Sequence, residues 1–141
     1  MSQPRTIVAF DFGLRRIGVA VGQDITGSAS PLGVVANRDD GVDHVAIAAL
    51  LREWRPTQLV VGMPAHADGS ASEMQAPVTA FIDELTRYEL PIETVDERYT
   101  SVDAERVLKA ARAKGSRRRI SKAMIDSTAA VFIAERYLSS G

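Results

Sequence analysis

The apolar residues of this chain fall into short runs with two kinds of spacing. Five runs are compact, as is typical of strands, and in the segments between and after them apolar residues recur every three or four positions, as is typical of helices. We predict strands over residues 6–12, 17–22, 32–36, 59–62 and 92–95, and helices over residues 43–54 and 100–114 and from residue 121 onward. A further helix carries apolar residues up to Leu85. It begins either at Ser72, through a capping box with Gln75, or near Ala76 with Pro77 at its first position.

The order of these elements predicts an α/β fold with a mixed five-stranded sheet. The first two strands are joined by a tight turn, so they should pair as an antiparallel hairpin. Residues 59–62 are continuously apolar and end in glycine, which suits a buried strand parallel to the first. Right-handed crossovers then place the first strand in the centre, with helices on both faces. The carboxyl ends of the parallel strands, near Phe12, Met63 and Asp96, should line one edge, where open α/β sheets place their sites.

Composition narrows the class of protein. The chain has 141 residues, 45% of them hydrophobic, which fits a single domain over residues 1–141 with a buried core. It has no cysteine, which excludes a disulfide framework, a thiolate zinc site and a cysteine nucleophile. No apolar stretch approaches the length of a membrane span, and the first strand begins almost at once, without an apolar leader. We therefore expect a soluble, cytoplasmic protein with no membrane partner.

The net charge of −1 conceals an uneven distribution. Residues 23–97 hold 4 basic and 13 acidic side chains, a net charge of −9, whereas residues 98–122 hold 9 basic and 2 acidic ones, a net charge of +7. The basic stretch indicates an anionic partner such as nucleic acid, although a solvated helix face explains its scattered part over residues 106–114 better. Arg117, Arg118 and Arg119 form a tight run after Gly115, in a predicted loop where they can reach a ligand.

Carboxylates occur at three places that the predicted fold brings towards one edge. Asp11 lies inside an apolar strand, where it either caps the following turn or binds a cation. Asp96 and Glu97 end the last strand, and strand alternation places them on opposite faces without deciding which faces Asp11. Asp126 lies on the apolar side of the last helix. Converging carboxylates repel one another unless a divalent cation binds, and oxygen ligands favour Mg²⁺ or Mn²⁺ over zinc.

Four ordered segments of the chain resemble the YqgF (RuvX) family. They are residues 11–20 (DFGLRRIGVA), 61–64 (VGMP) with 68–70 (DGS), 96–101 (DERYTS) and 122–130 (KAMIDSTAA). These RNase H-like proteins are described as Holliday junction resolvases and as nucleases that mature the precursor of 16S ribosomal RNA. The resemblance implies an RNase H-like fold and catalytic, metal-binding acids at Asp11, Glu97 and Asp126. Many RNase H-like nucleases carry another acid at the end of the fourth strand, where this chain has Val60–Met63 and no acid. The sequence therefore leaves open whether the site binds one metal ion or two.

The expected activity is therefore metal-dependent hydrolysis of nucleic-acid phosphodiester bonds. Basic residues beside the acids and in the basic stretch should hold the phosphate backbone without reading sequence. They are Arg15, Arg16, Arg98, Arg117, Arg118, Arg119 and Lys122.

Two alternatives from other classes compete with a nuclease. An ATP-binding module of the actin, Hsp70 and sugar-kinase kind also opens with an acid-glycine hairpin, but it needs two such domains, and this chain supplies one. An inactive RNA-binding factor in ribosome biogenesis differs from the nuclease only in activity.

Among nucleic acids we favour precursor ribosomal RNA over a four-way DNA junction. Resolving a junction takes paired incisions, most simply made by a dimer. The apolar stripes of this chain are all needed for one small core, so we expect a monomer, with a weak dimer as the alternative.

Overall fold

The computed structural model describes residues 5–64, 72–96 and 122–140, and within the last segment the side chains of residues 127–139. The strands are β1 Thr6–Asp11, β2 Arg16–Gln23, β3 Ser28–Arg38, β4 Gly41–Val42, β5 Gln58–Met63 and β6 Ile92–Asp96. The helices are α1 His44–Trp54, α2 Gln75–Leu85, the 3₁₀ helix η1 Thr86–Tyr88 and α4 Lys122–Ser140. The predicted helix over residues 100–114 lies outside the described residues. Within the described ranges, no helix has both the length and the apolar character needed to span a membrane.

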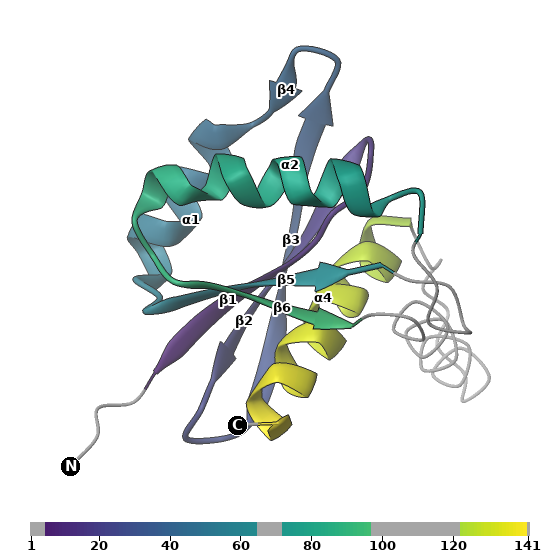
Figure 1. The fold of residues 1–141 in the computed structure, drawn as a ribbon. Helices are drawn as coiled ribbons and strands as arrows, with labels where there is room; N and C mark the ends of the chain where they lie inside the picture. Colours follow the sequence, from purple (N-terminus) through teal and green to yellow (C-terminus); the bar gives the residue numbers. More distant parts are fainter. Residues whose placement is uncertain (1–4, 65–71, 97–121, 141) are drawn as a thin grey trace, which may run out of the picture.

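The strands form one sheet in the order β4-β3-β2-β1-β5-β6, so β1 lies inside it (Figure 1). β2 runs antiparallel to β1, and β5 and β6 follow in parallel. This arrangement confirms the predicted mixed sheet with the first strand at its centre. The strand number in the described part of the chain is six rather than the expected five, because Gly41 and Val42 pair with Arg38 and Asn37 as β4. A strand this short has no period that a sequence can show.

β3 is longer than the predicted strand over residues 32–36, because it also includes residues 28–31 and residues 37 and 38. Pro31 lies opposite Ala20, at a register shift between Val19 and Ala20. Proline has no N–H to donate to a strand ladder, so it is tolerated at bulges and on edge strands. Since β4 pairs only with residues 37 and 38, β3 is an edge strand at Pro31. Pro31 is therefore accommodated in an irregular part of the strand.

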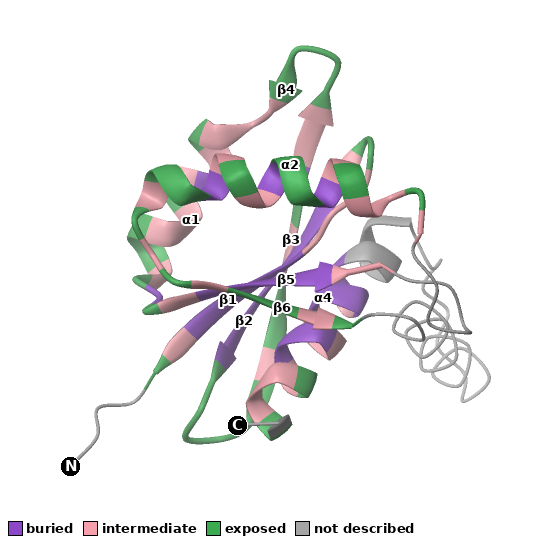
Figure 2. Ribbon diagram, viewed as in Figure 1, coloured by how far each residue is buried: buried purple, intermediate pink, exposed green. Residues whose placement is uncertain are grey.

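Helices cover both faces of the sheet, as predicted (Figure 1). On one face α1 and α2 bury a cluster with Phe10 and Phe81, whose rings meet edge to face with centroids 5.6 Å apart. On the other face α4 buries a separate cluster with Ile7, Ala9 and Ile133. Figure 2 shows the buried residues concentrated on the central strands, between these two helical layers.

Local signals explain where the first two helices begin. The side chain of Asp43 accepts a hydrogen bond of 3.1 Å from the main-chain N–H of Ala46, so α1 begins at the expected place. α2 begins at Gln75, and Ser72 Oγ accepts from the N–H of Met74 (3.1 Å) rather than from that of Gln75. The predicted start near Ala76 is therefore correct to within one residue, although Pro77 is the third residue of α2 and not the first. The capping box is wrong, because Ser72 Oγ accepts one residue before the capping-box position.

Candidate active site

Asp11 is the last residue of β1, at the carboxyl edge of the parallel strands. Alternate residues of β1 face opposite layers, with Phe10 in the α1 and α2 cluster and Ile7 and Ala9 in the α4 cluster. By the same alternation Asp11 belongs to the α4 side. It is half-buried and has an interaction partner within the structure. The carboxylate at the end of the central strand therefore lies on the face that α4 covers.

The turn after Asp11 is held by a residue from a third strand. Asn37, in β3, donates from its side-chain Nδ2 to the carbonyl of Gly13 (2.9 Å) and from its main-chain N–H to the carbonyl of Arg15 (3.0 Å). A Cβ atom at Gly13 would collide with the main-chain carbonyl oxygen of Arg16, so the tightness of the turn requires glycine there. These contacts hold the turn that carries Arg15 and leads into Arg16, a few residues after Asp11. Sequence reasoning missed Asn37, because its role depends on the register between β2 and β3.

The end of β6 lies at the same edge. Met63 of β5 is aligned with Asp96 of β6, and Phe10 of β1 is aligned with Val61 two residues before Met63. Val95 packs in the α4 cluster and Ile92 in the opposite one, which confirms the predicted alternation along β6. Asp96 follows Ile92 in this alternation, so it falls on the side away from α4.

α4 packs closely on the first two strands. A Cβ atom placed on Gly22 of β2 would lie 3.1 Å from Leu138 Cδ1, 3.4 Å from Ala134 Cβ and 3.1 Å from Ile7 Cγ1. Glycine at this position therefore permits the helix to approach. Further along α4 towards its first turn, Ala129 and Ala130 are buried, and so is Ser127, which has an interaction partner. The last turns of α4 thus lie over the start of β1, and its first turns point towards the end of β1 that carries Asp11 (Figure 1).

A hydrogen bond also joins α4 to the last described residue of β6. The guanidinium of Arg136 donates to the main-chain carbonyl of Asp96. This contact ties the helix to the end of the strand after which Glu97 follows in the sequence.

The structure describes only part of the predicted site. Asp11, Arg15 and Arg16 are described: Asp11 ends β1, Arg15 lies in the turn that follows, and Arg16 begins β2. For Asp126 and Lys122 the main chain lies in α4. Glu97, Arg98, Arg117, Arg118 and Arg119 lie outside the described residues. Among the side chains that are described, no three His, Asp or Glu residues gather closely enough to hold a metal ion.

The fold resembles that of Holliday junction resolvases of known structure. RuvC from Thermus thermophilus, in a structure titled as a complex with Holliday junction substrate, gives a TM-score of 0.59 at 14% identity, over 96% of this chain and 94% of that one. A fowlpox virus resolvase in complex with Holliday junction DNA gives a TM-score of 0.52 at 11% identity, over 96% of this chain and 97% of that one. These likenesses, together with the sheet order, define an RNase H-like fold.

Sequence comparison assigns the family. Residues 5–140 match the family model RuvX, described as Holliday junction resolvase. A relative from Paraburkholderia xenovorans (strain LB400), named "Putative pre-16S rRNA nuclease", is 41% identical over 134 residues, which cover 94% of this chain and 87% of the relative. A relative of the same name from Dechloromonas aromatica (strain RCB) is 42% identical over 136 residues, covering 96% of this chain and 91% of the relative. The chain belongs to the RuvX family, which confirms the resemblance, and it is a hydrolase of the nuclease class.

Proposed function

We propose that this protein is a divalent-metal-dependent endonuclease that matures the precursor of 16S rRNA, acting as a single domain over residues 1–141. Asp11, Glu97 and Asp126 are the proposed catalytic and metal-binding carboxylates. The observation that carries the proposal is the place of Asp11, half-buried at the carboxyl end of the central strand and on the α4 side of the sheet. The names of the relatives support the substrate.

The packing of α4 supports Asp126 as a partner of Asp11. Ala134 and Leu138 lie over Ile7, as their distances from Gly22 indicate. The four residue steps along β1 from Ile7 to Asp11 cover about 13 Å, and about nine residues of an α-helix cover the same length. The part of α4 around Asp126 lies about nine residues before the turn that spans Ala134 and Leu138. The two aspartates are therefore proposed to lie level with each other along β1.

The packing of β6 supports Glu97 over Asp96. Val95 contributes to the α4 cluster, and alternation assigns residue 97 to the side of Val95 if the strand geometry continues. Asp96 belongs to the opposite side and is exposed. The main-chain carbonyl of Asp96 accepts a hydrogen bond from Arg136. We therefore propose that Asp96 helps to position the end of β6 and that Glu97 is the metal ligand.

The proposed donor set consists of carboxylate oxygens, which fits Mg²⁺ or Mn²⁺. When bound, such a cation supplies positive charge at the scissile phosphate and makes a water molecule more nucleophilic. Asp11 holds its place because β1 is buried between two strands and its turn is clamped by Asn37. Arg15 and Arg16, on the same hairpin, are proposed to bind phosphates that flank the cut.

The proposed nucleic-acid footprint continues through Arg98, Arg117, Arg118, Arg119 and Lys122, which carry most of the positive charge of residues 98–122. Contacts of this kind hold the phosphate backbone and weaken with salt, and they do not read bases. We propose RNA as the preferred nucleic acid, a monomer as the active form, and the cytoplasm, where ribosomal RNA of bacteria is processed, as the place of action.

A Holliday junction is the second candidate substrate, because the family model carries that description and the fold is shared with RuvC. The test compares a precursor 16S rRNA fragment with a mobile four-way DNA junction at equal concentration, in Mg²⁺ and in excess EDTA. Light scattering on the same sample gives the oligomeric state. We expect metal-dependent cutting of the RNA by a monomer. A stable dimer that nicks the junction symmetrically and spares the RNA would overturn the substrate proposal, and full activity in EDTA would overturn the metal.

A further inference from the structure

Two adjoining hollows form a continuous groove between α1 and the η1–β6 connection. The larger has a volume of about 510 Å³ and is lined by residues that include Leu51, Pro56, Tyr88 and Leu90. The second, of about 360 Å³, continues along α1 to Val45, and both hollows share Arg52. We call the combined feature the α1 groove. Its size matches that of sites that take up one or two large side chains of a ligand.

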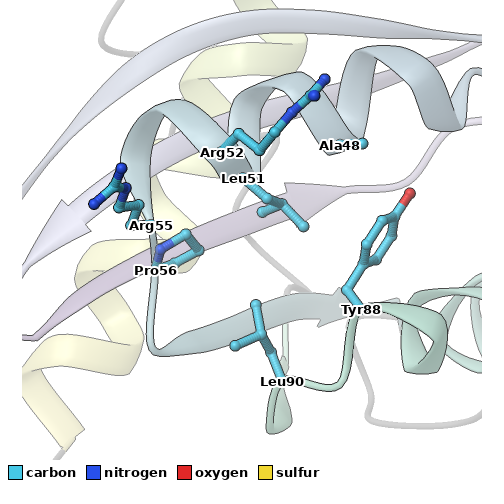
Figure 3. Close-up of a pocket in the computed structure, with 7 residues that line it drawn as sticks. All are labelled: Ala48, Leu51, Arg52, Arg55, Pro56, Tyr88 and Leu90. Carbon is cyan, nitrogen blue, oxygen red and sulfur yellow. The ribbon is translucent and has the colours of Figure 1, made fainter.

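The floor of the α1 groove is apolar. In Figure 3 the side chains of Leu51, Tyr88 and Leu90 face one another across the groove, and Pro56 closes one end. Val45, at the other end, is 79% exposed and adds apolar surface there. The groove therefore offers apolar surface that the described part of the chain leaves open to solvent.

The rim of the α1 groove is cationic. Residues 23–97 contain 4 arginines and no lysine among 13 acids, and three of those four arginines line this groove: Arg52, Arg55 and Arg87. Within the described ranges, none of the three forms an ion pair with a carboxylate. Arg87 Nε donates to the main-chain carbonyl of Glu84 (3.1 Å), which leaves its positive charge without a carboxylate partner among the described residues. Three such guanidinium groups in an otherwise acidic region are complementary to a negatively charged ligand, and arginine binds carboxylates through two parallel hydrogen bonds.

One wall of the groove is held rigidly. His44 Nδ1 is 2.7 Å from the hydroxyl of Tyr88, and His44 Nε2 is 3.0 Å from Glu84 Oε1. Burial raises the pKa of Tyr88 above its usual value, so the phenol stays neutral at physiological pH. These contacts fix the tyrosine ring, and a preformed wall lowers the entropy that a ligand loses on binding.

The end of the α1 groove that holds Pro56 and Leu90 lies at the edge of the sheet opposite to the proposed catalytic site. It is bordered by Arg55 and Pro56, just before β5 begins at Gln58, and by Leu90, just before β6 begins at Ile92. Asp11 lies at the carboxyl ends of the same parallel strands. A ligand in the α1 groove can therefore bind while the proposed site holds nucleic acid.

We propose that the α1 groove is a docking site for an acidic protein segment, which inserts one large apolar side chain between Leu51, Tyr88 and Leu90 and places flanking carboxylates on Arg52, Arg55 and Arg87. An RNA strand is less suitable, because interfaces with nucleic acid are polar and would leave the apolar floor unfilled. The chain's own residues 98–122 carry a net charge of +7 and do not complement the arginines.

The proposal is tested by selecting short random peptides, displayed on phage, for binding to the full chain. We expect enriched peptides to carry an aromatic or large aliphatic residue flanked by Asp or Glu. A synthetic copy should bind the Arg52→Glu variant at least about tenfold more weakly than wild type, because one close charge pair becomes a repulsion. The matched control is Arg38→Glu, which reverses the remaining arginine of residues 23–97, on the exposed end of β3, and should bind like wild type.

The same variants distinguish the other outcomes. Cleavage of nucleic acid should be unchanged in Arg52→Glu, so loss of docking and loss of catalysis are separable. Failure to enrich any peptide, enrichment of peptides without acids, or equal binding by Arg52→Glu and wild type would each overturn the proposal. If Arg52→Glu instead weakens binding of a short single-stranded RNA while no peptide is enriched, the groove is an RNA surface and the proposal is wrong.

Discussion

The two faces of the sheet are packed with side chains of different size. Among the described side chains, the buried members of the cluster under α1 and α2 include Phe10, Phe81 and Leu85, whereas those of the cluster under α4 are alanines and β-branched residues, with Tyr137 and Leu138 partly buried against them. Large buried side chains supply most of the hydrophobic free energy of a small domain. Small ones supply less, but they allow a helix to come closer to a strand. The comparison indicates that the α1 and α2 face mainly stabilises the fold, and that the α4 face mainly positions groups.

The proposed chemistry explains why the α4 face needs close packing. An aspartate side chain is short, so two aspartates from a helix and a strand can share a cation only if their main chains approach closely. Gly22 and Ala134 provide that approach near the far end of the helix, where an added Cβ would already lie within 3.1–3.4 Å of its neighbours. The predictions below test this division between a stabilising face and a positioning face, beginning with the largest expected effect.

Replacing a large residue of the α1 and α2 cluster should lower stability without changing the site. Leu85 is fully buried at the end of α2, so Leu85→Ala should lower the free energy of unfolding by about 2–5 kcal/mol. Urea denaturation measures the loss. Val45→Ala, an exposed aliphatic change on the same layer, is the matched control and should stay within about 0.5 kcal/mol of wild type. Cleavage per folded molecule should be that of wild type, and a selective loss of cleavage in Leu85→Ala would show that this face also serves the site.

Asp11→Asn should have the opposite profile. It removes a charge at the proposed site with little change of shape, so cleavage should fall by at least about 100-fold. The melting temperature without metal should be equal to or above that of wild type, because repulsion between carboxylates is relieved. Asp24→Asn, which loosens an exposed ion pair with Arg5, is a control for removing a carboxylate elsewhere. Wild-type cleavage by Asp11→Asn would exclude Asp11 as an essential ligand.

Gly22→Val tests whether close packing of α4 matters for function at a distance. The added side chain should push against Leu138 and Ala134 and cost about 1–3 kcal/mol. Cleavage should fall by about tenfold or more even where the protein is folded, since small displacements of catalytic groups lower rates strongly. Ser30→Val, at an exposed position on the neighbouring strand β3, is the control. Loss of stability alone, with full cleavage by the folded fraction, would remove the positioning role of this face.

Asn37 should have a smaller effect, through the hairpin turn. Asn37→Asp replaces the amide donor by a carboxylate that faces the carbonyl of Gly13, at a cost of about 1–3 kcal/mol. Asn37→Ala should be milder, because the gap contains no repelling charge. Protonation of the introduced carboxyl restores a donor, so the cleavage rate of Asn37→Asp relative to Asn37→Ala should rise as the pH falls. A ratio that does not change with pH would contradict the clamp.

Several elements were predictable because their signals are local. The tight turn predicts the hairpin, the apolar runs predict the parallel strands, and the helical apolar period predicts the start of α1 near Asp43. The structure confirms each of these. β4, the extension of β3 through Pro31 and the contacts of Asn37 and His44 depend on register and on residues far apart in the sequence. No window of sequence contains both partners of such contacts.

The candidate site divides in the same way. The alternation along β6 follows from the sequence pattern, and the structure confirms it. The sequence predicts a first strand that runs to Phe12 with Asp11 inside it, whereas β1 ends at Asp11. The convergence of Asp11 with Glu97 and Asp126 stays a prediction, because it depends on how a loop and a helix meet the edge of the sheet. The α1 groove gave no signal in the sequence, since its arginines are spread between α1 and η1.

The most direct test of the central claim is to locate Mn²⁺ by its paramagnetic broadening of amide signals in NMR spectra of the labelled full chain. The account predicts that substoichiometric Mn²⁺ broadens the signals of Asp11, Gly18 and Ser127 first and leaves those of Gly22 and Leu138, at the other end of β1 and α4, sharp. Asp11→Asn should abolish this selective pattern. Broadening that is strongest away from Asp11, or that persists unchanged in Asp11→Asn, would contradict a metal site between the end of β1 and the first turns of α4.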